Sequence, residues 1–281
     1  MRNQRLLFSL AHPDDEAFGS GGLIAKYTSE GAQVSLICAT DGARGTIDQK
    51  FLDEHGSHSA VRYAELDCAA EKLGFHEVIR LDYRDSGMMG SPENDDPESL
   101  WQQDERRVAG QIVATIRRLK PQVVVTFDPY GGYGHPDHIF MHRATTRAFH
   151  AAGDAEQFPE AGAPYAPQKL YYTAFPRLTL RVFILLTRLR GEDPRALGIN
   201  KDLDLIAIQD NLLKITTRVL VAPYLAQGEA AARCHASQLN PSTSTPRWVR
   251  RFLGRHQTLT RAEPAPAPRE PRERDLFAGV S

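Results

Sequence analysis

The chain has 281 residues, and its 34 Lys and Arg residues nearly balance 35 Asp and Glu residues, giving a net charge of −1. A near-neutral chain of this length argues against nucleic acid as the main partner, and it is long enough to bury a full hydrophobic core. No apolar run approaches the roughly 20 residues that a membrane span needs, and the first residues lack a signal-peptide pattern. We therefore expect a cytoplasmic protein with no transmembrane segment.

The cysteines support the same expectation. Cys38, Cys68 and Cys234 are odd in number, are widely spaced and form no CxxC pair. Each lies in an apolar or helical context, which is typical of reduced core cysteines in a cytosolic protein.

Strand and helix patterns alternate along the first half of the chain. Short apolar runs predict buried strands at residues 6–10, 33–39, 77–81 and 122–127. Helical spacing predicts helices at residues 23–27, 59–73 and 99–119, the last opened by a capping box at its first four residues. This alternation indicates an α/β fold, a Rossmann-like, doubly wound and mostly parallel sheet with helices on both faces. With strand order 3-2-1-4, the loops after the first and fourth strands should meet.

The loop after the first strand carries a dense group of metal-binding residue types. His12, Asp14, Asp15 and Glu16 follow the strand directly. Like charges this close repel one another and cost desolvation unless a cation is present. A solvated acidic loop is the alternative, and this loop alone does not decide between them.

The loop after the fourth strand provides the missing half. It contains Tyr133, His135, Asp137 and His138 among glycines, and a helix is predicted from 139 to 151. By itself, His-Pro-Asp-His could be only a turn that caps this helix. Two such loops at the two positions that the topology brings together predict a metal site with an open coordination position.

The two loops also resemble a known family, the LmbE-like or PIG-L-like metal-dependent N-deacetylases. The family's signatures correspond to residues 11–16 and 134–138. Segments 41–45, 62–65 and 84–88 resemble the branch that acts on mycothiol and bacillithiol precursors, and 235–238 matches a late family element. The resemblance extends over residues 6–240 and implies a zinc-dependent hydrolase that removes an N-acetyl group from an N-acetylglucosamine-type substrate.

The resemblance also implies a role for each site residue. The metal ligands would be His12, Asp15 and His138, binding Zn²⁺ or, alternatively, Fe²⁺. Asp14 would be the general base that takes a proton from metal-activated water.

Six further residues receive roles in the same way. His135 would polarise the oxyanion or donate a proton, with Asp137 orienting its imidazole, and Tyr133 would be a second oxyanion donor. The substrate-binding residues would be Arg62, Asp85 and Arg44. Without the resemblance, Tyr133 could simply pack, and Arg62 could pair with Glu65 one helical turn away.

Alternative functions remain open at this point. A related amidase would cleave a mycothiol-conjugate-type amide, and a catalytically inactive relative would only bind sugar. A nucleotide-binding module is suggested by the glycines of residues 19–22 after a strand, although Ile24 stands where the dinucleotide fingerprint requires its third glycine. The expected partner is a small acylated amino-sugar.

The second half of the chain carries weaker signals. Strands are predicted at residues 169–174, 203–208 and 216–221, and a helix at 223–238. His235 near the end of this helix is expected to be structural. The apolar stretch 178–190 contains several arginines, so it could form a lid, a weak contact with an anionic membrane surface, or a contact between copies in a homo-oligomer.

The chain is expected to divide near residue 240. Residues 1–240 would form the deacetylase domain with a C-terminal α/β extension. The tail, 241–281, is rich in Pro and Arg, including Arg247, Arg250, Arg251 and Arg255. Because residues 263–274 offer few apolar side chains, we expect the tail to be partly disordered.

Overall fold

The computed structural model of the protein describes residues 4–198, 201–239 and 254–281. Within these residues a single mixed sheet of seven strands has the order β3-β2-β1-β4-β5-β7-β6. The strands are β1 Arg5–Leu10, β2 Gln33–Thr40, β3 Glu77–Tyr83, β4 Val123–Thr126, β5 Lys169–Thr173, β6 Thr217–Leu220 and β7 His256–Glu263. The first five run parallel, whereas β7 is antiparallel to both β5 and β6. The predicted order 3-2-1-4 is confirmed.

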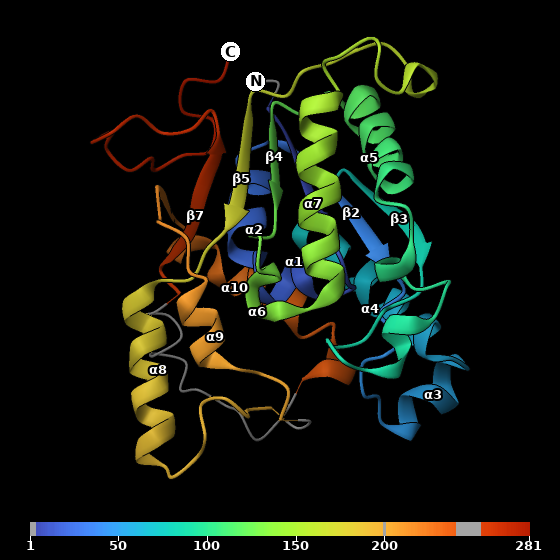
Figure 1. Ribbon diagram of the computed structural model, residues 1–281, viewed down its shortest axis with the longest axis vertical. Helices are drawn as coiled ribbons and strands as arrows, with labels where there is room; N and C mark the ends of the chain where they lie inside the picture. The colour runs from blue at the N-terminus through green and yellow to red at the C-terminus, as the bar shows by residue number, and fades with distance from the viewer. Residues whose placement is uncertain (1–3, 199–200, 240–253) are drawn as a thin grey trace.

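Helices cover both faces of this sheet (Figure 1). The main helices are α2 Gly21–Ser29, α4 His58–Leu73, α5 Glu105–Leu119, α7 Pro136–Ala151 and α10 Leu225–Ala232. The pair α5 and α7 packs on one face, and α2, α4 and α10 pack together on the other. The predicted α/β class is therefore confirmed. The buried central strands β1, β2 and β4 are apolar along nearly their whole length because neither face meets water.

Shorter elements connect these layers. The short helices are α1 Asp15–Phe18, α3 Gln49–His55, α6 Gly131–Gly134, α8 Arg177–Leu189 and α9 Leu205–Asp210. The 3₁₀ turns are η1 Pro92–Asp95, η2 Leu100–Gln102, η3 Pro159–Ala161, η4 Ala222–Tyr224 and η5 Ala236–Gln238.

Three element predictions are wrong in detail. The strand expected at 203–208 is helix α9, because the Asp204 carboxylate accepts the amides of Ile206 and Ala207 and caps a helix start. The capping box at 99–102 forms only a 3₁₀ turn, and α5 begins after Asp104, whose carboxylate accepts the Arg106 amide. The helix expected at 223–238 ends at Ala232, ahead of His235.

The tail differs most from its prediction. Arg247, Arg250 and Arg251 lie outside the described residues, but 256–263 form β7, which inserts between β5 and β6. The following segment is held by ion pairs: Glu273 meets Lys169 and Arg261, each at 2.6 Å. Partial disorder is therefore not found in the described part of the tail, because its charges are paired inside the fold rather than solvated. The same sheet also extends across the domain boundary predicted near residue 240.

The reduced state predicted for Cys68 and Cys234 is wrong. The structure joins them in a disulfide that links α4 to the segment after α10, across 166 residues of sequence. Only Cys38 is a free thiol, buried in β2. The expectation of a cytoplasmic location loses its cysteine argument and stays a prediction. Among the described residues, none of the helices has the length and apolar character required to cross a bilayer.

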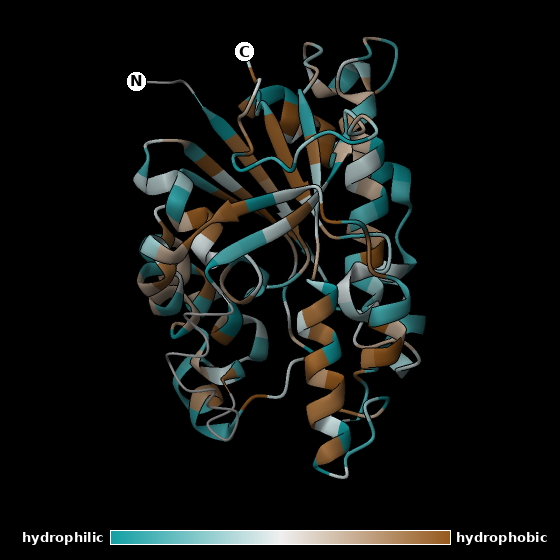
Figure 2. Cartoon of the chain, turned by 90° about the vertical axis from the view of Figure 1, so that its left-hand side faces the viewer, coloured by the Kyte–Doolittle hydropathy of each residue, from teal (hydrophilic) through white to brown (hydrophobic). Residues whose placement is uncertain are grey.

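Helix α8 has two different apolar faces. Its inner face, with Leu180 and Ile184, packs in a small cluster with α9 and with Tyr130 and Tyr133. Its outer face exposes a row of apolar side chains: Leu178, Val182, Leu185, Leu186 and Leu189. The ribbon of α8 is mostly brown, the colour of apolar residues, at the bottom of Figure 2. The roles of lid, membrane contact and contact between copies stay predictions.

Candidate active site

The first signature forms a sharp turn at the carboxyl end of β1. Asp14 has φ 134° and ψ −25°, a backbone conformation that residues other than glycine rarely adopt. Asp15 begins the short helix α1. The Asp15 carboxylate accepts the backbone amides of His12 at 2.7 Å and Ala11 at 3.2 Å. The backbone of the turn therefore fixes the orientation of the Asp15 carboxylate without a ligand.

The second signature lies opposite, at the carboxyl end of β4. His135 caps α7, since its Nδ1 accepts the Asp137 amide, and His138 stands in the first turn of that helix. Gly131 has φ 68°, and a Cβ there would lie 2.8 Å from the His138 Cβ. Only glycine lets the loop pass this close to His138. The two predicted loops do meet.

The side chains of His12, Asp15 and His138 converge on one point. His12 Nδ1 lies 3.1 Å from His138 Nε2 and 3.6 Å from Asp15 Oδ2, and His138 Nε2 lies 3.3 Å from Asp15 Oδ1. Ligands of a tetrahedral zinc with bonds of about 2.0–2.1 Å are about 3.3 Å apart. The donor spacing thus fits the three-ligand site predicted from the sequence. His135 also offers a nitrogen within 4.8 Å of those of His12 and His138.

The remaining ring nitrogens explain why these donors suit a cation. His138 Nδ1 lies 3.0 Å from the Gly131 carbonyl, and His12 Nε2 lies 3.1 Å from the Asp137 carboxylate. Both contacts suit a ring proton on the outer nitrogen, which would leave the inner nitrogen to a metal once the inner proton of His12 is displaced. Burial opposes charge on His12, but Asp85, Asp137 and Asp15 outweigh it and raise its pKa well above the ordinary value. The cluster favours positive charge at its centre.

Asp14 is held beside this cluster by a buried arginine. Arg62 Nη2 donates to Asp14 Oδ2 at 2.8 Å and also to the Pro13 carbonyl. Burial raises the pKa of Asp14, and Arg62 opposes that rise. Arg62 is only 2% exposed and lies 3.7 Å from Glu65, so it serves the carboxylates around it. Its predicted grip on the sugar stays a prediction.

His135 and Tyr133 complete the wall opposite Asp14. Burial, followed by His12 and His138, lowers the pKa of His135 well below its ordinary value. Burial, with Asp15 nearby, raises the pKa of the Tyr133 phenol, so its proton is retained. The rings of the two residues meet edge to face at 6.0 Å. A neutral imidazole and a protonated phenol are both hydrogen-bonding groups for a developing oxyanion.

The structure adds a contact to Asp137, whose predicted orienting role toward His135 stays a prediction. Its carboxylate contacts the His12 imidazole, whereas His135 receives only its backbone amide. Asp137 is itself fixed by Ser86, which donates to it from both its backbone amide, at 2.9 Å, and its hydroxyl. Ser86 was not predicted, although it lies in a segment that carries the resemblance. Asp137 and His138 are adjacent on α7, yet Asp137 contacts the outer nitrogen of His12 whereas His138 faces Asp15.

The predicted substrate residues line one cavity of about 570 Å³. Asp85 lies 3.5 Å from His12 Nε2 and accepts the Arg44 backbone amide, while the Arg44 side chain turns to Glu93 at the rim. The cavity has the size of a small-ligand site. Its described lining combines both signatures with loop 42–50 and the late segment after α10: His12, Asp14, Arg44, Arg62, Asp85, Met88, Tyr133, His135, Ser237 and Gln238 among others.

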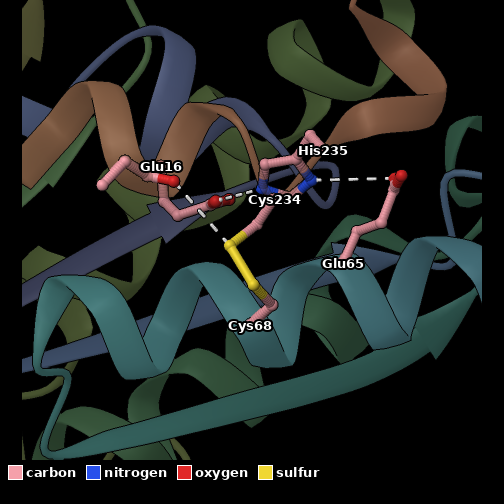
Figure 3. The surroundings of a disulfide bond; sticks show 6 residues. Glu16, Glu65, Cys68, Cys234 and His235 are labelled. Carbon is pink, nitrogen blue, oxygen red and sulfur yellow. Dashed lines mark hydrogen bonds and ion pairs between the residues drawn. A yellow bond between two sulfur atoms is a disulfide. The ribbon is translucent and has the colours of Figure 1, made fainter.

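Behind the turn lies a second group that sequence analysis did not assign to the site. Glu16 and His235 are fully buried, and His235 Nε2 lies 2.6 Å from Glu16 Oε1. Figure 3 shows this pair beside the Cys68–Cys234 disulfide. The match of 235–238 to a family element was the only sequence signal for His235. Its expected structural character is consistent with its burial.

The glycines that suggested a nucleotide site serve helix packing instead. A Cβ on Gly21 would lie 3.1 Å from Gly228 Cα, and one on Gly228 would lie 2.8 Å from Gly22 N. These glycines let α2 and α10 approach closely and face each other rather than a ligand. The nucleotide-binding interpretation is therefore wrong.

Comparison with known proteins agrees with the two signatures. Residues 7–149 match the family described as "PIG-L: GlcNAc-PI de-N-acetylase". A protein of Geodermatophilus obscurus is 38% identical over 84% of this chain and 83% of its own length, and one of Streptomyces avermitilis is 36% identical over 99% and 98%. Both are named 1D-myo-inositol 2-acetamido-2-deoxy-alpha-D-glucopyranoside deacetylase.

Solved structures show the same fold. The N,N'-diacetylchitobiose deacetylase of Pyrococcus horikoshii superposes with a TM-score of 0.63 at 20% identity, covering 92% of this chain and 84% of that one. The teicoplanin deacetylase Orf2 superposes with a TM-score of 0.53 at 16% identity, covering 93% of this chain and 100% of that one. At such identities the likeness extends to the fold alone.

Proposed function

The chain belongs to the PIG-L (LmbE-like) family, and on that premise we propose that it is a metal-dependent N-deacetylase acting on an N-acetylglucosamine-type substrate. The observation that carries the proposal is the convergence of His12, Asp15 and His138 beside a cavity that His12 and Asp14 line. The names of the relatives favour an N-acetylglucosaminyl inositol as the substrate.

His12, Asp15 and His138 would hold the metal, with Zn²⁺ as first choice and Fe²⁺ as the alternative. A bound zinc would supply a Lewis acid and lower the pKa of water at its open position to about 7. Asp137 orients His12, and the Gly131 carbonyl orients His138, so both rings are preset for this task.

The chain's own groups then divide the proton transfers. Asp14, whose burial raises its pKa, takes the proton of the attacking water. Tyr133 and His135 stabilise the oxyanion formed from the amide carbonyl, each contributing about 3–4 kcal/mol if well aligned. The leaving amine takes its proton from Asp14, which has gained one from the water, while the neutral His135 stays an oxyanion donor. Arg62 keeps Asp14 directed into the cavity.

The first experiment measures metal content and amine release on the same purified protein. We expect about one metal per chain and release of amine from N-acetylglucosaminyl inositol. Asp14→Ala should keep the metal and lose about 10²–10⁴-fold in kcat. Asp67→Ala, an exposed carboxylate on α4 outside the cavity lining, is the matched control and should stay near wild type.

Each outcome has a separate meaning. Metal without cleavage of any acetylated sugar, but with cleavage of a thiol-conjugate amide, would replace the deacetylase with the related amidase. A protein that binds no Zn²⁺ or Fe²⁺, or an Asp14→Ala variant with wild-type activity, would contradict the proposal.

A further inference from the structure

The turn that carries the catalytic aspartate is strained, and something must hold it. Asp14 is one of few non-glycine residues with positive φ among the described residues, and its φ of 134° is far from the left-handed region that such residues usually adopt. Residues in such conformations are strained and persist only where their surroundings fix them. Its carboxylate direction depends on that backbone angle.

One side chain contacts the strained peptide directly. Glu16 Oε2 accepts the Asp14 backbone amide at 3.0 Å, only two residues along the chain. The Asp14 carbonyl in turn accepts the amides of Ala17 and Phe18, both at 2.9 Å. The Glu16 carboxylate therefore closes the turn on its amino side, where α1 has no other side-chain cap.

The other oxygen of Glu16 is held from outside the turn. His235 Nε2 meets Oε1 at 2.6 Å, and both side chains are fully buried. A buried carboxylate needs such a partner, because burying an unpaired charge is strongly unfavourable. His235 also packs edge to face on Phe18, at 5.7 Å between ring centroids.

His235 is itself anchored on both sides along the chain. The preceding residue, Cys234, is joined to Cys68 of α4 (Figure 3). Two residues later, Ser237 donates its amide at 2.6 Å and its hydroxyl at 2.8 Å to Glu65, also of α4. Glu65 in turn lies beside Arg62, which grips the Asp14 carboxylate. The backbone and the carboxylate of Asp14 are thus both tied to α4.

We propose that Glu16 and His235 are positioning residues for Asp14: Glu16, fixed by His235, holds the Asp14 backbone in its strained conformation and so aims the carboxylate into the cavity. Neither residue lines the cavity, so neither touches substrate. The inference rests on the proposed function through the role of Asp14 as general base.

The test removes the two residues with Asp14 present and absent. Glu16→Ala should lower kcat by about 10–100-fold, since a misplacement near 1 Å costs on that order. KM and metal content should change little. Glu16→Gln keeps an oxygen for the Asp14 amide and should recover most of kcat. His235→Ala should lower kcat less than Glu16→Ala, because it acts through Glu16.

The Asp14→Ala background separates positioning from general damage. There, adding Glu16→Ala or His235→Ala should cost nothing further in kcat, because the group that they position is gone. An equal further loss in that background would overturn the inference. Glu273→Gln removes another buried carboxylate that lies outside the cavity lining, and it should leave kcat unchanged. An equal loss in Glu273→Gln would also overturn it.

A crystal structure of Glu16→Ala, or of His235→Ala if the first does not fold, gives a readout without activity. We expect the φ angle of Asp14 to move away from 134° and its carboxylate to turn away from Arg62. An unchanged Asp14 would overturn the inference. If Asp14→Ala keeps wild-type activity, the proposed function fails, whereas the relaxed backbone in the crystal would still uphold the hold of Glu16 on Asp14.

Discussion

Two buried polar groups lie on opposite sides of the same turn. On the cavity side, His12, Asp15 and His138 bring three potential metal-ligating atoms together. On the other side, Glu16 and His235 pair at 2.6 Å behind a disulfide, and His235 Nδ1 has no hydrogen-bond partner among the described residues. Both groups are almost inaccessible, and both contain histidine and a carboxylate.

The difference is in where the lone pairs point. In the cavity group, outer contacts occupy the far ring nitrogens and leave the near ones facing one another. In the sealed group, the Glu16 oxygens are already engaged by the Asp14 amide and the His235 ring. The adjacent residues Asp15 and Glu16 therefore differ in role. Asp15 offers a carboxylate oxygen to the candidate metal site, whereas both Glu16 oxygens are bound by groups of the protein. Convergence of several donor atoms beside the cavity, rather than residue type or burial, distinguishes the candidate metal site.

The sharpest test of this comparison replaces one histidine of each group with alanine, in separate variants. His138→Ala should abolish stoichiometric metal binding and lower kcat/KM by more than about 10³-fold, because it removes one of three ligands. His235→Ala should keep the metal, since its partner is a carboxylate of its own group. Elemental analysis of both purified variants measures this. Loss of metal in His235→Ala alone would reverse the assignment, and exposed His150 on α7 gives the control His150→Ala.

The next effect concerns the disulfide behind the sealed group. Replacing both Cys68 and Cys234 with Ser should lower the free energy of unfolding by about 2–5 kcal/mol, because a native crosslink across a long loop restricts the unfolded chain. Metal content should be unchanged. Urea unfolding without reductant compares the variant with wild type, and Cys38→Ser is the control. A matching loss of metal would show that the two groups are not separable.

The smallest effect concerns another group of paired charges, around Glu273, which lies outside the cavity lining. Burial opposes ionisation of Glu273, but Lys169, Tyr171 and Arg261 outweigh it and lower its pKa. Its stabilisation is therefore complete above the unfolded pKa of about 4.3 and is lost as the pH falls through the lower folded pKa.

Glu273→Gln should accordingly lower the free energy of unfolding at neutral pH by about 1–3 kcal/mol. The difference between variant and wild type should shrink as the pH is lowered below about 4. Urea unfolding over this pH range measures it, with the more exposed Glu263→Gln as control. A difference that grows on acidification would contradict the assigned pairing.

The sequence was a good guide to the cavity group. Parallel strands bring their carboxyl ends to one edge, so the order 3-2-1-4, predicted from the sequence, places His12 and His138 together. The resemblance supplied roles that spacing alone does not give. Neither predicts that the Asp137 carboxylate contacts His12, because a one-residue step along α7 decides which histidine it meets.

The sealed group was missed for a different reason. Its members are separated by 219 residues along the chain, and pairs this distant leave no periodic pattern in one sequence. The cysteines failed likewise, since an odd count concealed one bonded pair and one free thiol. In the tail, charge and proline content suggested solvation, but composition does not reveal that Glu273 and Arg261 pair with each other.

The position of β7 has a consequence for the order in which the molecule can be built. In the sheet of the described residues, β6 lies at the edge beside β7, and β7 follows it in the chain. The part of the sheet that carries both signatures can assemble earlier in translation, while β6 must wait for its neighbour. Tyr27, in one of the first helices, also waits for Asp275 and the Leu276 amide. A nascent chain can thus hold both signatures in place before β7 joins its sheet.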